Sequence, residues 1–263
     1  MDNVETNLVS GSIYGLLGLN GVGKTTFLKL LCGLLFPKAG TVTVGGLTPS
    51  ARSIPFLSDI YFVTDEVDLP SWTISQFIDM YGPLYHKFDL TYFEEVLSAF
   101  QVDRRASIKA LSYGQQKKLN IAFALATNVA MLLMDEPTNG LDIPSKTQFR
   151  KILARYISED KTVIISTHQI RDIQNLIDHL LVLQDNRLIL DSSLYELGKK
   201  IKFQQGKYAD AWYSESSISG TQSIRPNIDE MDTPFDIELF FNALSQHPEI
   251  MNKLSTPVLE NHE

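Results

Sequence analysis

A glycine-rich segment near the start of the chain has the residue types needed to hold phosphate groups. Residues 18–25 read Gly-Leu-Asn-Gly-Val-Gly-Lys-Thr, which matches the pattern of Gly, four residues, Gly, Lys and Ser or Thr. Glycines let backbone N–H groups approach phosphate oxygens, Lys24 adds a positive charge, and the Thr25 hydroxyl is a ligand suited to Mg²⁺. An apolar run at 13–17 precedes the segment and a helical pattern follows it, as a nucleotide-binding loop requires and a chance glycine-rich turn does not.

Two acidic residues after a second apolar run could supply a metal ligand and a base. The run at 131–134 has the pattern of a strand buried on both faces, and Asp135 and Glu136 follow it directly. Parallel strands bring their carboxyl ends to one edge of a sheet, so this strand can place Asp135 beside the phosphate loop, where it would hold Mg²⁺ through water. Glu136 could then polarise a water molecule for attack on a phosphate. An isolated pair of acids is usually only a strand end, and the phosphate loop is what makes this pair a candidate site.

A third segment combines a serine and a glycine at the start of a predicted helix. Residues 111–116 read Leu-Ser-Tyr-Gly-Gln-Gln, and the helix is expected over 114–127. Ser112 and the backbone N–H groups near Gly114 could surround a γ-phosphate there. Ser112 could equally be an ordinary helix N-cap, a common role for serine. Taken alone, the segment favours the interpretation of Ser112 as a helix N-cap.

Strands and helices alternate along the chain, which predicts an α/β fold with a mostly parallel sheet flanked by helices. Strands are expected at 13–17, 41–44, 60–63, 131–134, 163–166 and 180–183. Helices are expected at 25–36, 114–127, 144–157, 170–177 and 192–201, with a helical, aromatic region from 71 to about 101. From about residue 200 onward the pattern is weak, and an apolar run returns only at 235–244. This part is either a regulatory or docking element or a variable tail packed on the core.

The composition is that of an ordinary globular protein and disfavours some classes of function. Hydrophobic residues make up 44% of the chain, and the formal charge of −8 disfavours a nucleic-acid-binding surface. The single cysteine, Cys32, cannot form an internal disulfide, and no apolar run approaches the roughly 18 residues that span a bilayer. Residues 1–10 lack a signal-peptide pattern. We therefore expect a cytoplasmic protein, for which any membrane contact comes through a partner.

The order of these motifs resembles that of the nucleotide-binding domain of ABC ATPases. The phosphate loop and residues 111–116, 131–136, 139–142 and 166–168 match, in order, the Walker A motif, signature, Walker B motif, D-loop and switch histidine. The resemblance runs from about residue 11 to 191. It implies a P-loop NTPase fold with an ABC-type helical subdomain at about 71–128.

The resemblance implies two ATP molecules held between two ATPase subunits that dimerise head to tail. The residues that would bind ATP and Mg²⁺ within one subunit are Gly18, Asn20, Gly21, Gly23, Lys24, Thr25, Thr26 and Asp135, with Thr25 and Asp135 as metal ligands. Glu136 would be the catalytic base, and His168 would contact the γ-phosphate and help to hold the attacking water. The residues that would act on the partner's ATP or connect the two sites are Ser112, Gly114, Gln115 and Asp142.

Three features depart from the family pattern. Tyr113 stands where the signature usually has its first glycine, which requires a backbone conformation open to other residues. The strand at 60–63 leads into Thr-Asp-Glu at 64–66 instead of a glutamine that binds Mg²⁺ and senses the transport partner, so Thr64 or Asp65 would have to reach the metal. The chain starts too late for the usual first antiparallel strand and the aromatic that stacks on adenine, so we expect an N-terminally shortened antiparallel β part.

The leading hypothesis is an ATP-binding and ATP-hydrolysing subunit of a multi-subunit ABC transporter, similar to the ABC-2-type exporter branch. Its partners would be a second ATPase subunit, in a homo- or heterodimer, and an integral membrane permease that docks on the aromatic region at 71–100. The resemblance thus implies a location peripheral on the inner face of the cell membrane, with membrane contact only through the permease. Two alternatives stay open: a soluble ABC ATPase that acts in complex assembly or remodelling, and a weakly hydrolysing regulatory subunit. We assign residues 1–200 to the ATPase domain and 201–263 to a C-terminal extension of unknown role.

Overall fold

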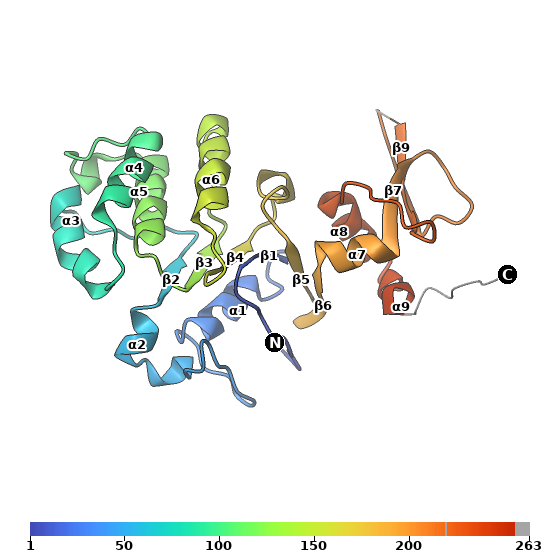
Figure 1. Ribbon diagram of the computed structural model, residues 1–263, viewed down its shortest axis with the longest axis horizontal. Coiled ribbons are helices and arrows are strands. Elements are labelled where there is room, and N and C mark those ends of the chain that lie inside the picture. The colour runs from blue at the N-terminus through green and yellow to red at the C-terminus, as the bar shows by residue number, and fades with distance from the viewer. Residues whose placement is uncertain (219, 256–263) are drawn as a thin grey trace.

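The core of the computed structural model, which describes residues 1–218 and 220–255, is a six-stranded sheet with helices on both faces (Figure 1). The strand order is β2-β3-β4-β1-β5-β6. The parallel strands are β1 (Ser12–Leu17), β2 (Ile60–Val63), β3 (Met131–Asp135), β4 (Thr162–Ser166) and β5 (His179–Gln184). β6 (Arg187–Ser193) pairs antiparallel with β5. The predicted α/β fold with a mostly parallel sheet is confirmed.

Alternate residues of the central strands pack against different helices. The helices next to the sheet are α1 (Lys24–Leu31), α2 (Ile54–Leu57) and α6 (Ile143–Tyr156). Leu133 belongs to a buried cluster with Phe27 of α1, whereas its neighbour Leu132 belongs to a cluster with Phe149 of α6. Because the strands are covered on both faces, their sequences are continuous apolar runs rather than alternating patterns.

A group of helices beyond β2 forms one end of the molecule (Figure 1). They are α3 (Ile74–Tyr81), α4 (Leu90–Ala99) and α5 (Tyr113–Ala126). The aromatic side chains of Phe77, Phe93 and Phe123 are buried between them, and the rings of Phe77 and Phe123 meet edge to face at 4.9 Å. The helical region predicted at 71–101 is therefore two helices, and most of its aromatic residues belong to the core.

Three predicted elements are wrong in extent or type. The helix expected at 25–36 ends at Leu31, because Gly33 adopts a φ of +70° that a helix cannot continue through. The strand expected at 41–44 contains only one bridge, between Val44 and Leu47, since this exposed segment has no neighbouring strand to pair with. The helix expected at 170–177 is a short 3₁₀ helix over Ile170–Asp172.

The weakly patterned C-terminal part has more regular structure than its sequence suggests. After α7 (Leu194–Lys200), the strands β7 (Ile201–Gln205), β8 (Tyr213–Ser217) and β9 (Gly220–Pro226) form an antiparallel sheet in the order β7-β9-β8. Helices α8 (Ile237–Gln246) and α9 (Ile250–Ser255) follow, and Phe240 of α8 is fully buried. Residues 256–263 of the predicted extension lie outside the described part. No helix within the described residues is long and apolar enough to cross a membrane.

Gly33 provides a direct test of the turn that ends α1. An added Cβ would lie 2.4 Å from the carbonyl oxygen of Pro49, at a φ that L-residues rarely adopt. Gly33→Ala should therefore lower the free energy of unfolding by about 2–4 kcal/mol, measured by urea denaturation. Gly198→Ala is the control, because a Cβ there meets no atom within 4 Å and should stabilise α7 by about 0.5–1 kcal/mol. Equal effects of the two changes would contradict this account.

Candidate active site

The glycine-rich loop at 18–25 joins the carboxyl end of β1 to the start of α1. Its glycines are structurally required, since Gly21 and Gly23 have φ angles of +80° and +108°. A Cβ at Gly18 would lie 2.6 Å from a methyl of Val22 and 2.7 Å from the carbonyl oxygen of Leu183. The loop therefore has the tight backbone path that lets N–H groups converge on an anion at a helix N-terminus.

Lys24, at the first position of α1, is folded back across this loop. Its buried ammonium donates to the carbonyl oxygens of Gly18 (2.7 Å) and Leu19 (3.3 Å). Burial lowers the pKa of Lys24, and the nearby carboxylates of Glu136 and Asp135 oppose that shift. The lysine charge is thus held inside the loop where a phosphate would lie. Asn20 is exposed on the loop, and Thr26 lies in the first turn of α1.

Asp135 links the loop to two strands of the sheet. One carboxylate oxygen accepts a hydrogen bond from the Thr25 hydroxyl at 2.6 Å, and the other accepts one from the Ser166 hydroxyl. In the sheet Asp135 lies opposite Ser166, because β3 and β4 are parallel and in register. The structure therefore brings together the two predicted oxygen ligands, Thr25 and Asp135, at the edge of the sheet beside the phosphate loop. Both are hard oxygen donors of the kind that Mg²⁺ prefers.

Glu136 and His168 are in direct contact next to this edge. The His168 ring Nδ1 lies 2.9 Å from one Glu136 carboxylate oxygen, and the His168 backbone N–H donates to the other at 3.3 Å. The Glu136 backbone N–H donates to the carbonyl oxygen of Ser166 at 3.0 Å. Glu136 also has a φ of +48°, an uncommon conformation for a residue with a side chain. Backbone and carboxylate are therefore both fixed in orientation.

The signature-like segment caps α5 and does not contact the phosphate loop of its own chain. The Ser112 hydroxyl accepts from the Gln115 backbone N–H, and the Gln115 side chain accepts from the Ser112 backbone N–H at 3.0 Å, which is a capping box. In the described part of the chain, neither these residues nor Gly114 hydrogen-bonds to the loop. Tyr113 is the first residue of the helix and does not have a positive φ, so a glycine is not required there.

The segment at 139–142 packs against the start of α5. A Cβ at Gly140, whose φ is +75°, would lie 3.1 Å from the ring of Tyr113, and a Cβ at Gly114 would lie 3.0 Å from the Gly140 carbonyl oxygen. Asp142 caps α6 by accepting from the Ser145 backbone N–H at 2.9 Å, and its hydrogen bonds to Ser145 lower its pKa. The close approach of Gly114 and Gly140 thus brings the segment that ends in Asp142 against the signature-like segment. Within the described residues, Asp142 has no hydrogen bond to the phosphate loop.

The sequence did not identify Lys117 or Ser166 as important residues of the site. Lys117 is completely buried, and its ammonium contacts both Asp65 and the Glu136 carbonyl oxygen. In the sequence Lys117 stands in the polar run Gln-Gln-Lys-Lys at 115–118, which gives no sign that its side chain is buried or what it contacts. Asp65 accepts from Lys117 through both its carboxylate and its carbonyl oxygen. The Thr64 hydroxyl donates to the Glu66 carbonyl oxygen at 2.6 Å. In the described part of the chain, neither Thr64 nor Asp65 hydrogen-bonds to Thr25 or Asp135, and a metal role for either residue stays a prediction.

Helix α8 borders the outer side of the phosphate loop, which the sequence also failed to predict. A cavity of about 320 Å³ lies between the loop, the turn after β5 and α8. Leu19 and Gly21 line it from the loop, Asn186 from the turn, and Phe241 and Leu244 from α8. The N-terminal end of the chain reaches the same turn, where the backbone N–H of residue 2 donates to the Asn186 carbonyl oxygen at 2.9 Å.

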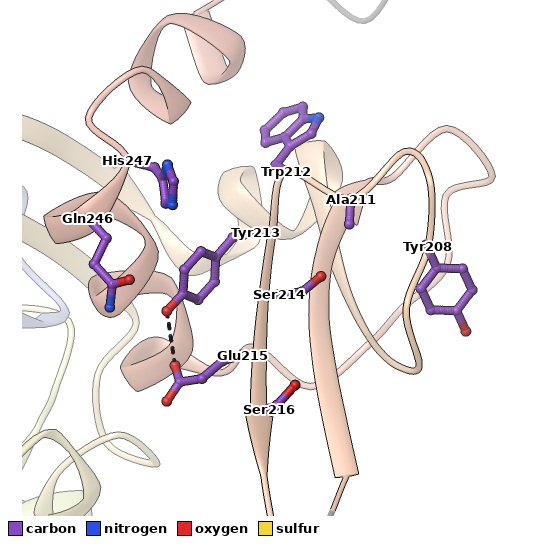
Figure 2. A pocket seen from close by; sticks show the side chains of 9 residues that line it. All are labelled: Tyr208, Ala211, Trp212, Tyr213, Ser214, Glu215, Ser216, Gln246 and His247. Carbon is purple, nitrogen blue, oxygen red and sulfur yellow. Dashed lines mark hydrogen bonds between the residues drawn. The ribbon is translucent and has the colours of Figure 1, made fainter.

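A separate hollow of about 550 Å³ opens on the C-terminal sheet (Figure 2). Tyr213 and Glu215 lie on the side of β8 that faces the end of α8, and the Tyr213 hydroxyl donates to the Glu215 carboxylate at 3.3 Å. Tyr208 lies on the other side of the strand. The hollow therefore straddles the edge of the sheet. It shares no lining residue with the phosphate loop, so it is not part of the candidate active site.

Comparison with known proteins gives matches over most of the chain. Residues 1–139 match the family model described as ABC transporter. The chain is 30% identical to the ABC transporter ATP-binding protein YtrB of Bacillus subtilis (strain 168) over 206 residues, which is 78% of this chain and 70% of that protein. It is 27% identical to the Nod factor export ATP-binding protein I of Neorhizobium galegae, over 89% of this chain and 68% of the relative.

Solved structures show the same architecture. A dimeric, post-hydrolysis form of the ATP-binding cassette MJ0796 bound to ADP and Pi is similar with a TM-score of 0.64 and 25% identity, covering 73% of this chain and 89% of that one. The cobalt transport ATP-binding protein cbiO-2 (ST1066) has a TM-score of 0.62 and 26% identity, covering 94% and 90% of the two chains.

Proposed function

The chain belongs to the ABC transporter ATP-binding family, and from this premise we propose how its residues bind and hydrolyse ATP. It is an ATP-hydrolysing subunit of a multi-subunit ABC transporter. We assign the ATPase domain to residues 1–200 and a C-terminal extension to 201–263. The start of the second sheet at β7 supports this boundary.

The phosphate loop and α1 hold the triphosphate in our proposal. Backbone N–H groups from Gly21 to Thr26 surround the β- and γ-phosphates, and the Lys24 ammonium exchanges its carbonyl acceptors for phosphate oxygens. Thr25 and Asp135 would hold Mg²⁺, directly or through water, a role that fits two oxygen atoms 2.6 Å apart beside the loop. When bound, Mg²⁺ would neutralise charge on the β- and γ-phosphates.

The observation that carries the hydrolytic assignment is the contact between Glu136 and His168 beside the loop. Glu136 accepts a proton from a water molecule while the water oxygen attacks the γ-phosphorus. The bond from that phosphorus to the β,γ-bridging oxygen breaks, and ADP leaves with its electron pair. His168 holds the Glu136 carboxylate in place and would contact the γ-phosphate of bound ATP. The described geometry thus supports a complete hydrolytic pair rather than a weakly hydrolysing subunit.

A second ATPase subunit supplies the groups that contact the γ-phosphate from the side opposite the phosphate loop. Ser112, Gly114 and Gln115 cluster at the positive end of α5, and none hydrogen-bonds to the phosphate loop of its own chain within the described residues. This arrangement supports a head-to-tail dimer, in which α5 of each subunit points its N-terminus at the ATP of the other. Asp142, joined to the same segment through Gly140, would relay changes between the two sites.

A groove beside the helical region is our proposed docking surface for a membrane-spanning partner. It has a volume of about 610 Å³ and lies between α2, β2, α3 and α5. Its lining is mostly apolar and aromatic, and includes Ile54, Leu57, Leu69, Phe77, Tyr81, Leu84 and Tyr85. Ile54 and Leu84 are 83% and 61% exposed, so they offer uncovered apolar surface at its rim. A helical segment of a permease would bury it, which would also hold this subunit at the inner face of the membrane.

Glu136→Gln tests the hydrolytic assignment. The amide keeps the shape of the carboxylate but cannot accept the proton, so ATP turnover should fall at least about a hundredfold. Equilibrium ATP binding should change little, because the phosphate loop is untouched. Turnover is measured as phosphate release by the complete transporter complex. Wild-type turnover in the variant would mean that this carboxylate is not the base, and would favour a regulatory subunit whose own site is idle.

Ser112 can be tested as an ATP contact separately from its role as a helix cap. Ser112→Ala should lower the free energy of unfolding by about 1 kcal/mol through loss of the cap. Ser112→Asp keeps an N-cap side chain and therefore the stability, but places a negative charge against the γ-phosphate of the other subunit. In the Glu136→Gln background, it should weaken ATP-dependent dimerisation at least about tenfold, measured by analytical ultracentrifugation. Unchanged dimerisation would leave Ser112 as a cap only.

The docking groove is tested with Leu84→Asp. A carboxylate at this exposed apolar position should keep the fold and ATP binding, yet reduce recovery of an integral membrane protein at least about tenfold in affinity purification from native membranes. Ile228→Asp, a change at a similarly exposed apolar position in the C-terminal extension, is the control and should recover it normally. Recovery of only soluble scaffold proteins by the wild-type chain would instead support the assembly or remodelling alternative.

A further inference from the structure

Lys117 is a buried cation whose ammonium group is fully surrounded by oxygen atoms. It lies in the second turn of α5 and has no exposed surface. The ammonium donates to the Glu136 carbonyl oxygen at 2.7 Å, the Asp65 carboxylate at 3.1 Å and the Asp65 carbonyl oxygen at 3.2 Å. An ammonium has three N–H donors, so all of them are used. Such a buried and fully satisfied charge costs desolvation and contributes chiefly by fixing geometry.

The Glu136 carbonyl oxygen accepts two hydrogen bonds. One comes from Lys117, and the other comes from the Asn139 backbone N–H at 3.2 Å and closes the turn that follows Glu136. The residue itself has the uncommon φ of +48°, so its backbone needs external contacts to keep the carboxylate directed at His168. Ser166 holds the N–H side of Glu136, and Lys117 holds the carbonyl side.

Asp65 gathers further contacts at the other end of the lysine. Its carboxylate accepts from the Asn139 side chain at 3.3 Å as well as from Lys117. Its carbonyl oxygen accepts from the Tyr113 hydroxyl at 2.9 Å. Asp65 therefore ties the segment after β2 to the start of α5 and to the turn after Glu136. The same segment continues along the docking groove, whose lining includes Thr64 and Asp68 on either side of Asp65.

We propose that Lys117 is a positioning residue for ATP hydrolysis, which holds the Glu136 backbone and connects it through Asp65 to the docking groove. The inference rests on the proposed role of Glu136 as the base. Lys117 touches neither the phosphate loop nor Thr25 or Asp135, so it acts on hydrolysis through Glu136 and not on nucleotide binding. A displacement of the segment at 64–68 by a docked partner would move Asp65, and Lys117 would pass that displacement to the catalytic carboxylate.

Lys117→Met removes the ammonium and keeps an unbranched chain of similar length. In the complete transporter complex, we expect kcat for ATP to fall at least about tenfold, because a misplaced base loses catalytic orientation. The Kd for ATP, measured with the fluorescent analogue TNP-ATP, should stay within about twofold, since the phosphate loop is unchanged. Lys117→Arg, which can still donate to both partners, should recover at least about a third of the turnover. Lys151→Met makes the same change on the exposed surface of α6 and should have wild-type kinetics.

Epistasis with Glu136 separates positioning from a general structural role. In the Glu136→Gln background, Lys117→Met should cause no further loss of turnover, because the group through which it acts is already disabled. An additional tenfold loss there, equal losses of ATP binding and kcat, or wild-type kcat in Lys117→Met alone would each overturn the proposal. If Glu136→Gln itself had wild-type turnover, the proposed function would fail instead.

Asp65→Asn keeps the proposal testable if Lys117→Met does not fold. The amide oxygen can still accept from Lys117, but without the charge that anchors the ammonium between the two segments. We expect a severalfold lower kcat and an unchanged Kd for TNP-ATP, measured where the protein is folded, together with a lower melting temperature because the buried ammonium loses its counter-charge. A kcat equal to that of the wild type in a folded Asp65→Asn protein would overturn the connection to the groove.

Discussion

The Asp135 carboxylate joins three segments of the chain at one edge of the sheet, and the nucleotide site depends on this junction. It accepts hydrogen bonds from Thr25, which follows the loop after β1, and from Ser166, which ends β4. The junction exists because β1, β3 and β4 are parallel and in register, with both Leu16 and Asp135 opposite Ser166. A shift of β3 by one residue would turn Asp135 to the other face of the sheet. A nearly buried carboxylate without these donors would be strongly destabilising, so the same bonds that stabilise the fold define the site.

Glu136, the residue after Asp135, has an uncommon backbone conformation that its neighbours hold in place. A positive φ at a residue with a side chain costs about 1 kcal/mol, and Glu136 keeps it because its N–H, its carbonyl oxygen and its carboxylate each have a partner. The partners come from β4, α5 and the segment after β4. The orientation of this carboxylate therefore depends on packing between elements that are far apart in the sequence, which makes it sensitive to movement of any of them.

The helical region contributes to the site by two contacts of different kinds. At the start of α5, the capping box pairs Ser112 with Gln115, and within the described residues neither side chain hydrogen-bonds to the phosphate loop of its own chain. One turn later, Lys117 ties the same helix to Asp65 and Glu136. A rotation of this region would thus move both the start of α5, our proposed contact with a second subunit, and the Glu136 carboxylate, our proposed base. The groove beside the helices is where an outside partner could cause such a rotation.

The sequence by itself determined the elements whose signals are local. The phosphate loop, the strand before Asp135 and the cap at Ser112 each depend on residues within a few positions, and the buried parallel strands were recognisable as apolar runs. The end of α1 was predicted too late, because Gly33 has a positive φ inside an apolar helical pattern, where a Cβ would clash with Pro49. The small C-terminal sheet had no clear apolar pattern, since several of its cross-strand pairs are polar, such as the exposed pair of Ser216 and Thr221. Only the tertiary structure decided which distant groups meet: Glu136 with His168, Lys117 with Asp65, and α8 with the phosphate loop. Such pairings follow from how strands and helices are stacked, and a local pattern contains no information on that stacking.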